Sequence, residues 1–298
     1  MRVFVTGASG FVGSAVVLEL LAAGHQVLGL ARSDAAAANV ASAGAQVHRG
    51  SLDDLDSLRS GAAVADGVIH TAYMHDFADY MEAARIDKRA IETIGEILAG
   101  SGRPFVVTSG TGGLRQGRVG TEEDESDPNS ATRLLSEVAA LSLASRGVRA
   151  SLLRLPSSVH GAGDHGFVPW LINIARAKGV SAYPGDGANR WPAVHRLDAA
   201  HLFRLALENA EAGSRLHAVA EEGIPVREIA SVIGRRLGVP VVSLPVEQAG
   251  DHFGFLGRFV SRDIPASSAL TRKRLKWYPV QPGLLADLDK DYYFAHEA

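Results

Sequence analysis

Apolar β-branched and aromatic residues come in short runs along the first half of the 298-residue chain, and helix-like patterns separate these runs. The runs predict six strands, at 3–6, 26–30, 46–48, 67–70, 105–108 and 149–155. Helices are predicted after the first strand and at about 51–60, 76–98 and 130–145, whereas 31–45 is predicted as a loop of small residues. Strands that alternate with helices through right-handed crossovers build a parallel sheet covered on both faces. We therefore expect an α/β fold with a doubly wound parallel sheet of the Rossmann type.

The pattern changes after Pro156, where proline, glycine and tryptophan interrupt the chain up to 192. Helices are predicted near 170–178 and 197–208, a last strand of the first sheet near 216–220, and shorter helices at 226–237, 268–275 and 284–291. The prediction is a first domain of residues 1–155 together with about 191–220, and a smaller, mostly helical domain of 156–190 and 221–298. The smaller domain is expected to cover the carboxyl ends of the strands, where open α/β sheets bind ligands.

Composition and charge narrow the class of protein. Lys and Arg number 30 and Asp and Glu 33, so the formal net charge is −3, without the basic excess that binding to nucleic acid or anionic membranes needs. The absence of cysteine excludes disulfides, cysteine–zinc sites and a thiolate nucleophile. A glycine cluster follows the first strand at once, which leaves no room for a signal peptide, and no apolar run is long enough to span a membrane. We expect a cytoplasmic protein that binds neither nucleic acid nor membrane.

The glycine cluster has the spacing G-x-x-G-x-x-G between the first strand and an amphipathic helix. In such a loop Gly7 would permit the tight turn, Gly10 would let the backbone approach a pyrophosphate, and Gly13 would let the helix pack closely on the sheet. The helix N-terminus adds unpaired amides and a positive dipole end for the phosphates. The alternative is an ordinary tight strand–helix turn. The loop predicts a dinucleotide site formed by Gly7, Ser9, Gly10, Phe11 and Val12.

The end of the second strand indicates which dinucleotide is bound. NAD sites place Asp or Glu there to accept a hydrogen bond from the ribose 2′-hydroxyl, but this chain has Ala31 at that position. Arg32 can instead pair with a 2′-phosphate, and Ser33 can add a further donor. The alternative is an exposed loop arginine with no ligand. We expect NADP(H) to be preferred over NAD(H).

Together with these residues, four further segments resemble the short-chain dehydrogenase/reductase superfamily, and most closely its extended or atypical branch of NAD(P)-dependent epimerases and dehydratases. The segments are 68–72, 106–109, 154–161 and 191–198. The resemblance implies that the fourth strand lies along the cofactor, that the fifth ends in a catalytic Ser or Thr, and that the sixth leads to the nicotinamide. It also implies that Leu52 lies near the adenine, although Ser51 stands where the family often has Asp. The further cofactor-binding residues so implied are Leu52, Thr71, Ala72, Thr108, Pro156 and Ser158.

The chain departs from this family at the acid–base centre, which is Tyr, three residues, then Lys. None of the six tyrosines is followed four residues later by lysine, and no lysine occurs between Lys88 and Lys178. Aligning Glu137 with the glutamate that often follows the motif places Asn129 at the tyrosine position and Arg133 at the lysine position. Arg133 could hold the nicotinamide ribose, but a guanidinium stays charged and cannot relay a proton.

Two residues could take over the role of the missing Tyr–Lys acid–base pair. Ser109, after the fifth strand, could polarise a substrate carbonyl or hydrogen-bond an alcohol, or it could merely satisfy a strand-end amide. Tyr73, after the fourth strand, could supply the phenol, or it could be a packed wall residue. The predicted catalytic residues are therefore Ser109, Tyr73 and Arg133. Histidines 75, 160, 165 and 195 are possible proton donors near strand ends or substrate loops, but their spacing matches no zinc signature, so no metal is predicted.

These residues favour an NADP-dependent oxidoreductase that transfers hydride to or from a small carbonyl or alcohol without the usual Tyr–Lys pair. Two alternatives stay open: a nucleotide-sugar epimerase or dehydratase, and an NADP-binding sensor or scaffold that has lost catalysis. Aromatic residues such as Phe167 and Trp170 near the predicted entrance favour an apolar or ring-bearing small-molecule substrate over a highly charged one, although core packing explains them equally well. The resemblance is compatible with a monomer or a homodimer.

Overall fold

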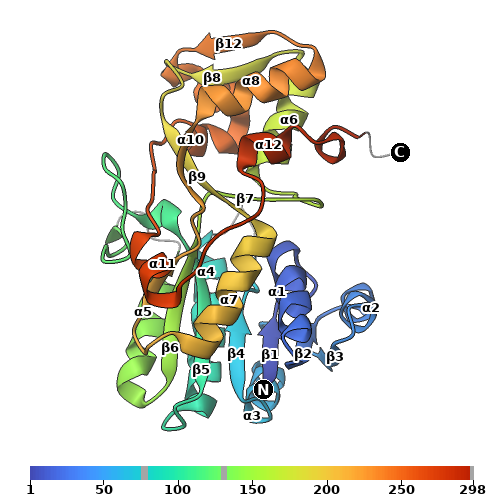
Figure 1. Cartoon of the computed structure of the whole chain (residues 1–298), viewed down its shortest axis with the longest axis vertical. Coiled ribbons are helices and arrows are strands. Elements are labelled where there is room, and N and C mark those ends of the chain that lie inside the picture. Colours follow the sequence, from blue (N-terminus) through green and yellow to red (C-terminus); the bar gives the residue numbers. More distant parts are fainter. Residues whose placement is uncertain (75–79, 129–132, 296–298) are drawn as a thin grey trace.

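A seven-stranded parallel sheet forms the lower part of the molecule in the computed structural model, which describes residues 1–74, 80–128 and 133–295 (Figure 1). The strand order is β3-β2-β1-β4-β5-β6-β10, and neighbouring strands pair in parallel. The strands are β1 (Arg2–Thr6), β2 (Gln26–Ala31), β3 (Gln46–Arg49), β4 (Gly67–His70), β5 (Pro104–Gly110), β6 (Arg149–Leu155) and β10 (Arg215–His217). The direction in which successive strands are added to the sheet reverses between β1 and β4, which confirms the doubly wound α/β fold. Strand β10 corresponds to the last strand that the sequence predicts.

Helices cover both faces of this sheet. They are α1 (Phe11–Ala22), α2 (Asp34–Ser42) and α7 (Arg196–Asn209) on one face, and α3 (Leu55–Ala63), α4 (Tyr80–Leu98) and α5 (Leu134–Ser142) on the other. Side chains of a strand alternate between the faces. Val3 and Val5 accordingly pack with α1 and α7, while Phe4 packs with α3 and α4. Both faces are buried, which explains the apolar strands of the sequence.

Helix α2 lies where the sequence predicts a loop of small residues, so that prediction was wrong. Alanine has the highest helix propensity, and the Ser33 hydroxyl caps the helix by accepting from the amide of Ala36 at 3.2 Å. Within α2 only Val40 is fully buried. A helix that buries one residue leaves almost no hydrophobic period to detect.

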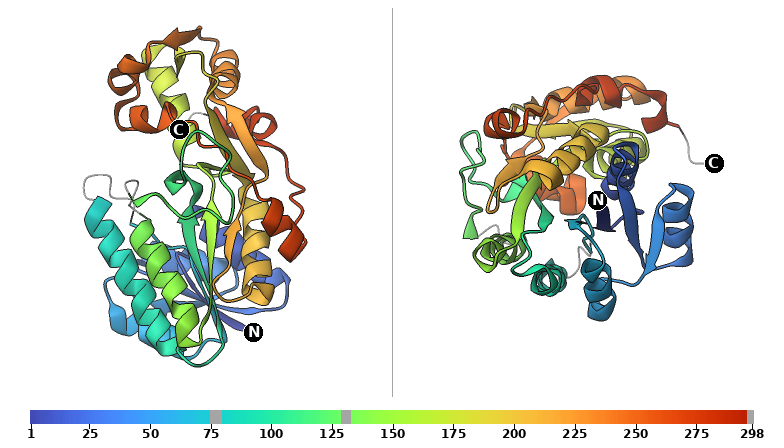
Figure 2. Two further views of the ribbon diagram at one scale, coloured as in Figure 1. Left: turned by 90° about the vertical axis from the view of Figure 1, so that its left-hand side faces the viewer. Right: turned by 60° about the horizontal axis from the view of Figure 1, so that its bottom comes forward.

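The upper lobe lies over the carboxyl ends of the large sheet (Figures 1 and 2). It contains two small sheets that the sequence did not predict: β7 (Ser158–His160), β9 (Arg190–His195) and β11 (Glu221–Pro225), and β8 (Ser181–Pro184) with β12 (Val241–Leu244). Its helices are α6 (Phe167–Lys178), α8 (Val226–Leu237), α9 (Ala249–Phe253), α10 (Gly257–Val260) and α12 (Leu284–Leu288), and α11 (Ala269–Leu275) packs beside α7 and β10. Within the described ranges, no helix is long and apolar enough to cross a membrane.

Candidate active site

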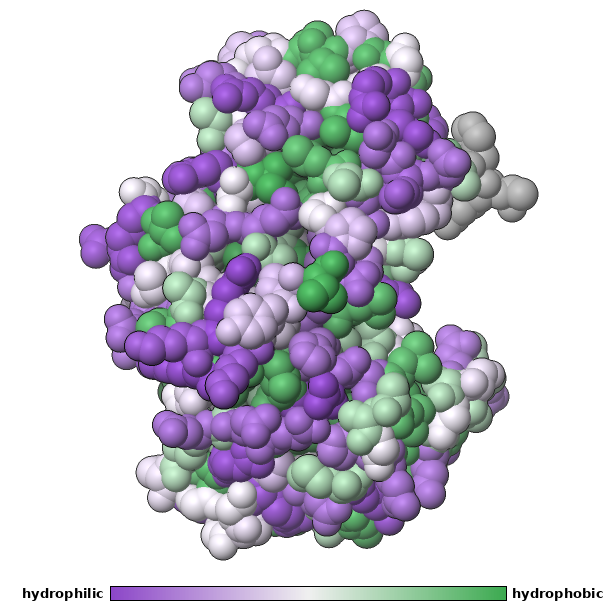
Figure 3. Space-filling view, in the orientation of Figure 1, coloured by the Kyte–Doolittle hydropathy of each residue, from purple (hydrophilic) through white to green (hydrophobic). Residues whose placement is uncertain are grey.

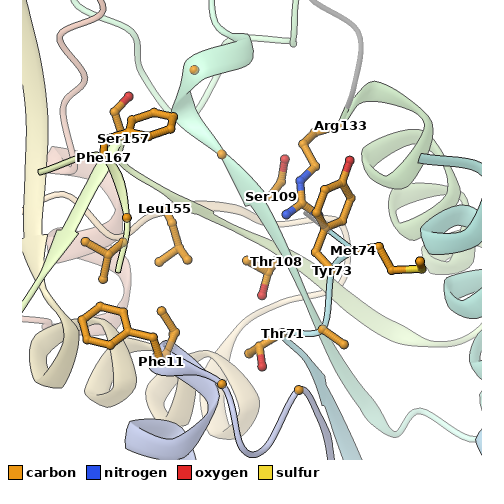
Figure 4. A pocket seen from close by; sticks show the side chains of 18 of the residues that line it. Phe11, Thr71, Tyr73, Met74, Thr108, Ser109, Arg133, Leu155, Ser157 and Phe167 are labelled. Carbon is orange, nitrogen blue, oxygen red and sulfur yellow. The ribbon is translucent and has the colours of Figure 1, made fainter. Parts of the chain in front are cut away.

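A cleft of about 1140 Å³ lies between the carboxyl ends of the large sheet and the upper lobe. Figure 3 shows the molecule indented between its two lobes. The cleft is lined by every site residue that the sequence predicts except Ser33, which caps α2. The structure therefore brings together residues from the ends of β1, β2, β4, β5 and β6. In Figure 4, Tyr73, Arg133 and Ser109 gather on one side of this space, and Phe11, Leu155 and Phe167 lie on the other.

The loop between β1 and α1 has the backbone shape that its glycines suggest. Gly7 has a φ of +69°, and a Cβ atom there would lie 2.7 Å from the amide nitrogen of Ala72. A Cβ atom on Gly13 would lie 2.0 Å from the carbonyl oxygen of Gly7, so α1 can approach the loop only with glycine at this position. Helix α1 begins at Phe11, and its N-cap residue Gly10 has no side chain to occupy the first amides. The loop thus presents helix-terminal donors to the cleft and fits a pyrophosphate group.

The end of β2 carries positive charge. Ala31 is buried, and exposed Arg32 lines the cleft. Arg49, at the end of β3, donates to the carbonyl oxygen of Ser33 at 2.8 Å and pairs with Asp34 at 2.7 Å. The sequence analysis missed Arg49 because only the parallel pairing of β2 with β3 places it beside Ser33. Arg32, beside the N-terminus of α2, fits a 2′-phosphate, and Arg49 holds the Ser33–Asp34 segment in place.

The guanidinium of Arg133 stacks on the ring of Tyr73, with its central carbon 3.4 Å from the ring centroid. Arg133 Nη1 lies 3.5 Å from Asp87 Oδ2. Burial raises the pKa of the Tyr73 phenol, and the nearby Arg133 charge offsets part of that rise. Tyr73 is therefore protonated at neutral pH and lies against a fixed cation, which would stabilise a phenolate formed there.

Asp87 on α4 is the centre of a buried polar network behind Arg133. Its carboxylate accepts from Ser136 and lies 2.9 Å from Nε2 of His70, whose Nδ1 is 2.8 Å from the Thr6 hydroxyl. Burial alone would raise the pKa of Asp87, but the His70 hydrogen bond and charge and the Arg133 charge outweigh burial and lower it. The sequence analysis did not select this network. The detectable signals were a histidine ending an apolar strand and an aspartate on the buried face of a helix.

Ser109 belongs to a second buried network. Its hydroxyl donates to Glu137 Oε1 at 2.6 Å, and Glu137 forms a two-pronged pair with Arg154 at 3.0 and 2.7 Å. Ser126, also at the cleft, donates to Glu137 Oε2 at 2.9 Å. Burial would raise the pKa of Glu137, but the hydrogen bonds and charge of Arg154 lower it, so Glu137 holds the Ser109 proton as a carboxylate. Ser109 Oγ then presents lone pairs to the cleft, and it satisfies a carboxylate rather than a strand-end amide.

The histidines lie in different places. His165 lines the cleft with its ring 5.6 Å from that of Phe11. His160 is buried, with Nδ1 2.8 Å from Asp287, and its ring lies 5.3 Å from that of His195. His75 and Asn129 lie outside the described residues. Among the residues that the structure describes, no group of three or more potential ligands could hold a metal ion.

The fold and the cleft define a dinucleotide-binding protein of the Rossmann class. The chain belongs to the NAD dependent epimerase/dehydratase family, whose model matches residues 3–219, and this confirms the resemblance found in the sequence. The family binds NAD(P) and includes oxidoreductases and epimerases.

Relatives extend over most of the chain. An uncharacterised protein of Schizosaccharomyces pombe is 57% identical, covering 99% of this chain and 100% of the relative. A 2-alkyl-3-oxoalkanoate reductase of Stenotrophomonas maltophilia is 29% identical, over 81% of this chain and 77% of the reductase. The solved structure of a dTDP-glucose 4,6-dehydratase from Streptomyces venezuelae with NAD bound has a TM-score of 0.79 at 21% identity, covering 99% and 97% of the two chains. That likeness shows the shared fold.

Proposed function

We propose that the chain is an NADP-dependent oxidoreductase that interconverts a small carbonyl compound and its alcohol. The observation that carries the proposal is the stack of Arg133 on Tyr73, beside Ser109, in the same cleft as the glycine loop. This stack offers a protonated phenol next to a fixed cation where the family's Tyr–Lys pair is missing. The names of two relatives, a ketoreductase of Stigmatella aurantiaca and the 2-alkyl-3-oxoalkanoate reductase, support carbonyl reduction.

The cofactor site fits NADP. We assign the pyrophosphate to the glycine loop, the 2′-phosphate to Arg32 and Ser33 at the start of α2, and the adenine to the side of Leu52. A bound nicotinamide would supply the hydride for reduction or accept it for oxidation. The remaining residues that we assign to the cofactor line the part of the cleft that would hold the nicotinamide half of the cofactor. They are Thr71, Ala72, Thr108, Arg133, Pro156 and Ser158.

In the reducing direction, the substrate carbon gains the hydride and its oxygen gains the phenolic proton of Tyr73. Burial favours the protonated phenol before the step, and Arg133 stabilises the phenolate after it. Because the Ser109 proton is held by Glu137, Ser109 Oγ accepts a hydrogen bond from the alcohol and so orients it. Arg133 moves no proton.

The Ser109–Glu137 bond also favours the second candidate, an NADP-binding sensor without turnover, because it takes away a donor that could polarise a carbonyl. Nucleotide-sugar epimerisation or dehydration is the third candidate. For the whole chain we further propose a cofactor domain of residues 1–155 with about 191–220, a substrate lid of 156–190 and 221–298, a cytoplasmic location, and a monomer or homodimer.

The test combines cofactor binding with a panel of ketones, aldehydes and alcohols, including sugar nucleotides. We expect NADPH to bind more tightly than NADH and to be consumed with at least one carbonyl compound of the panel. Tight NADPH binding with no turnover across the panel would establish the sensor instead. Tighter NADH binding would refute the assignment of Arg32.

A further inference from the structure

The part of the cleft under the upper lobe has an aromatic wall. The rings of Trp170 and Phe255 meet edge to face at 5.1 Å between centroids, and Phe167 lies 5.3 Å from Phe259 and 5.7 Å from Trp191. All five line the cleft, and Trp170 is 45% exposed. When an apolar ligand covers an indole that is otherwise open to water in a concave site, the burial of apolar surface favours binding.

Two arginines, Arg258 on α10 and Arg262 just beyond it, line the same region. Arg262 Nη2 donates to the carbonyl oxygen of Gly112 at 3.0 Å, and the Gln116 amide, turned so that its oxygen faces Arg262, accepts from Nε at 3.1 Å. Both partners are neutral. Burial lowers the pKa of Arg262, and the charge of Asp127 offsets part of that shift.

Two further acidic groups nearby, Asp263 and Asp164, are engaged elsewhere. Asp263 pairs with Arg190 at 2.9 Å. Asp164, which also lines the cleft, accepts from the Gly166 amide at 2.7 Å and from the Tyr293 hydroxyl at 3.0 Å. Within the described part of the chain, no carboxylate forms an ion pair with Arg258 or Arg262. The aromatic wall therefore carries two guanidinium groups that form no ion pair with a carboxylate of the described residues.

We propose that this region binds an organic monoanion, a carboxylate on an apolar or ring-bearing body, with Arg258 and Arg262 taking the carboxylate and the aromatic wall taking the body. The inference rests on the proposed function, in which the opposite end of the cleft holds the cofactor. It names the substrate class as oxo or hydroxy acids rather than neutral ketones. Carboxylates suit guanidinium groups because the two oxygens match the paired donors.

The test measures binding rather than turnover. The probes are 4-phenylbutyrate and its neutral primary amide, titrated with NADP present and followed by tryptophan fluorescence, since two of the three tryptophans, Trp170 and Trp191, line the cleft. We expect the acid to bind about tenfold more tightly than the amide, the ratio expected of one charge-assisted hydrogen bond. Arg258→Gln should reduce the ratio to about threefold or less, and Arg262→Gln should do the same. The control Arg227→Gln, an exposed arginine outside the cleft, should leave it unchanged.

The inference would be overturned if wild type bound the acid and the amide equally well. It would also be overturned if Arg258→Gln and Arg262→Gln both kept the wild-type ratio of acid to amide affinity. UDP-glucose that binds more tightly than 4-phenylbutyrate, and loses affinity in Arg258→Gln, would overturn the monoanion in favour of a nucleotide. A selective acid site in a protein that never consumes NADPH would support the inference and refute the proposed function.

Discussion

The Asp87→Asn substitution removes the buried carboxylate on which His70, Ser136 and Arg133 converge. Asparagine keeps nearly the same shape, and its oxygen can still accept from one group, but its NH₂ group then faces donors. Each hydrogen bond to a charged group contributes about 1.5–3 kcal/mol, and removing one partner of a buried ion pair costs about 3–5 kcal/mol. Because Arg133 is partly exposed and its contact with Asp87 is 3.5 Å, its share is small. We expect the free energy of unfolding to fall by roughly 3 kcal/mol.

The assay is urea denaturation at pH 7 followed by tryptophan fluorescence, together with the Kd for NADPH. Since the pKa of Asp87 lies below its ordinary value, its stabilisation is complete at neutral pH and is lost as pH falls through the acidic range below about 4. Releasing Arg133 from Asp87 should also weaken NADPH binding about tenfold. The control Ser136→Ala removes one donor and leaves the charge, so it should cost only about 1 kcal/mol. An Asp87→Asn protein within about 1 kcal/mol of wild type, with unchanged NADPH affinity, would refute the role given to Asp87.

Three further results are expected. Gly13→Ala should lower stability by ~2 kcal/mol in urea denaturation and weaken NADPH binding, because its Cβ would lie 2.0 Å from the Gly7 carbonyl oxygen; unchanged values would contradict the tight packing of α1. Arg32→Ser should raise the Kd for NADPH about 10–100-fold in direct titrations and leave that for NADH unchanged, whereas equal losses would place Arg32 elsewhere. Burial lowers the pKa of His217 to about 4, so the unfolded chain binds more protons between about pH 4 and 6.5, and stability falls as pH falls. Between pH 7.5 and 5 this loss should be about 2 kcal/mol in urea denaturation and be largely absent in His217→Gln; the same loss in that variant would exclude His217 as its source.

The elements of the large sheet were predictable because their signals are local. Most of its strands are compact apolar runs. In the upper lobe, the helix at 226–237 was predictable for a similar reason, because it ends at Gly238, a residue in the left-handed region, where the sequence placed its end. The small sheets of the upper lobe were not predictable. Strand β9 pairs with β7 and β11, which lie about 30 residues to either side, and three to six residues give no period that separates a strand from a loop.

The candidate site also has a part that could be predicted from the sequence and a part that could not. The glycine loop is contiguous, so its spacing alone indicated a dinucleotide. The buried networks join positions far apart in sequence: His70 and Thr6 are separated by 64 residues, and Ser109 and Glu137 by 28. Propensity and periodicity carry no information on such contacts. The sequence could name Tyr73, Arg133 and Ser109 one by one, but the stack of Arg133 on Tyr73 depends on how β4 and α5 pack against α4.

The central claim is that Tyr73 supplies the proton in place of the missing tyrosine. Its most direct test is the single-turnover rate of NADPH oxidation in Tyr73→Phe, measured with the carbonyl compound that wild type reduces fastest. General acid catalysis contributes about 10²–10⁴-fold, so we predict a rate at least about 100-fold lower with the NADPH Kd within about threefold of wild type. A Tyr73→Phe enzyme that transfers hydride at the wild-type rate would contradict the account.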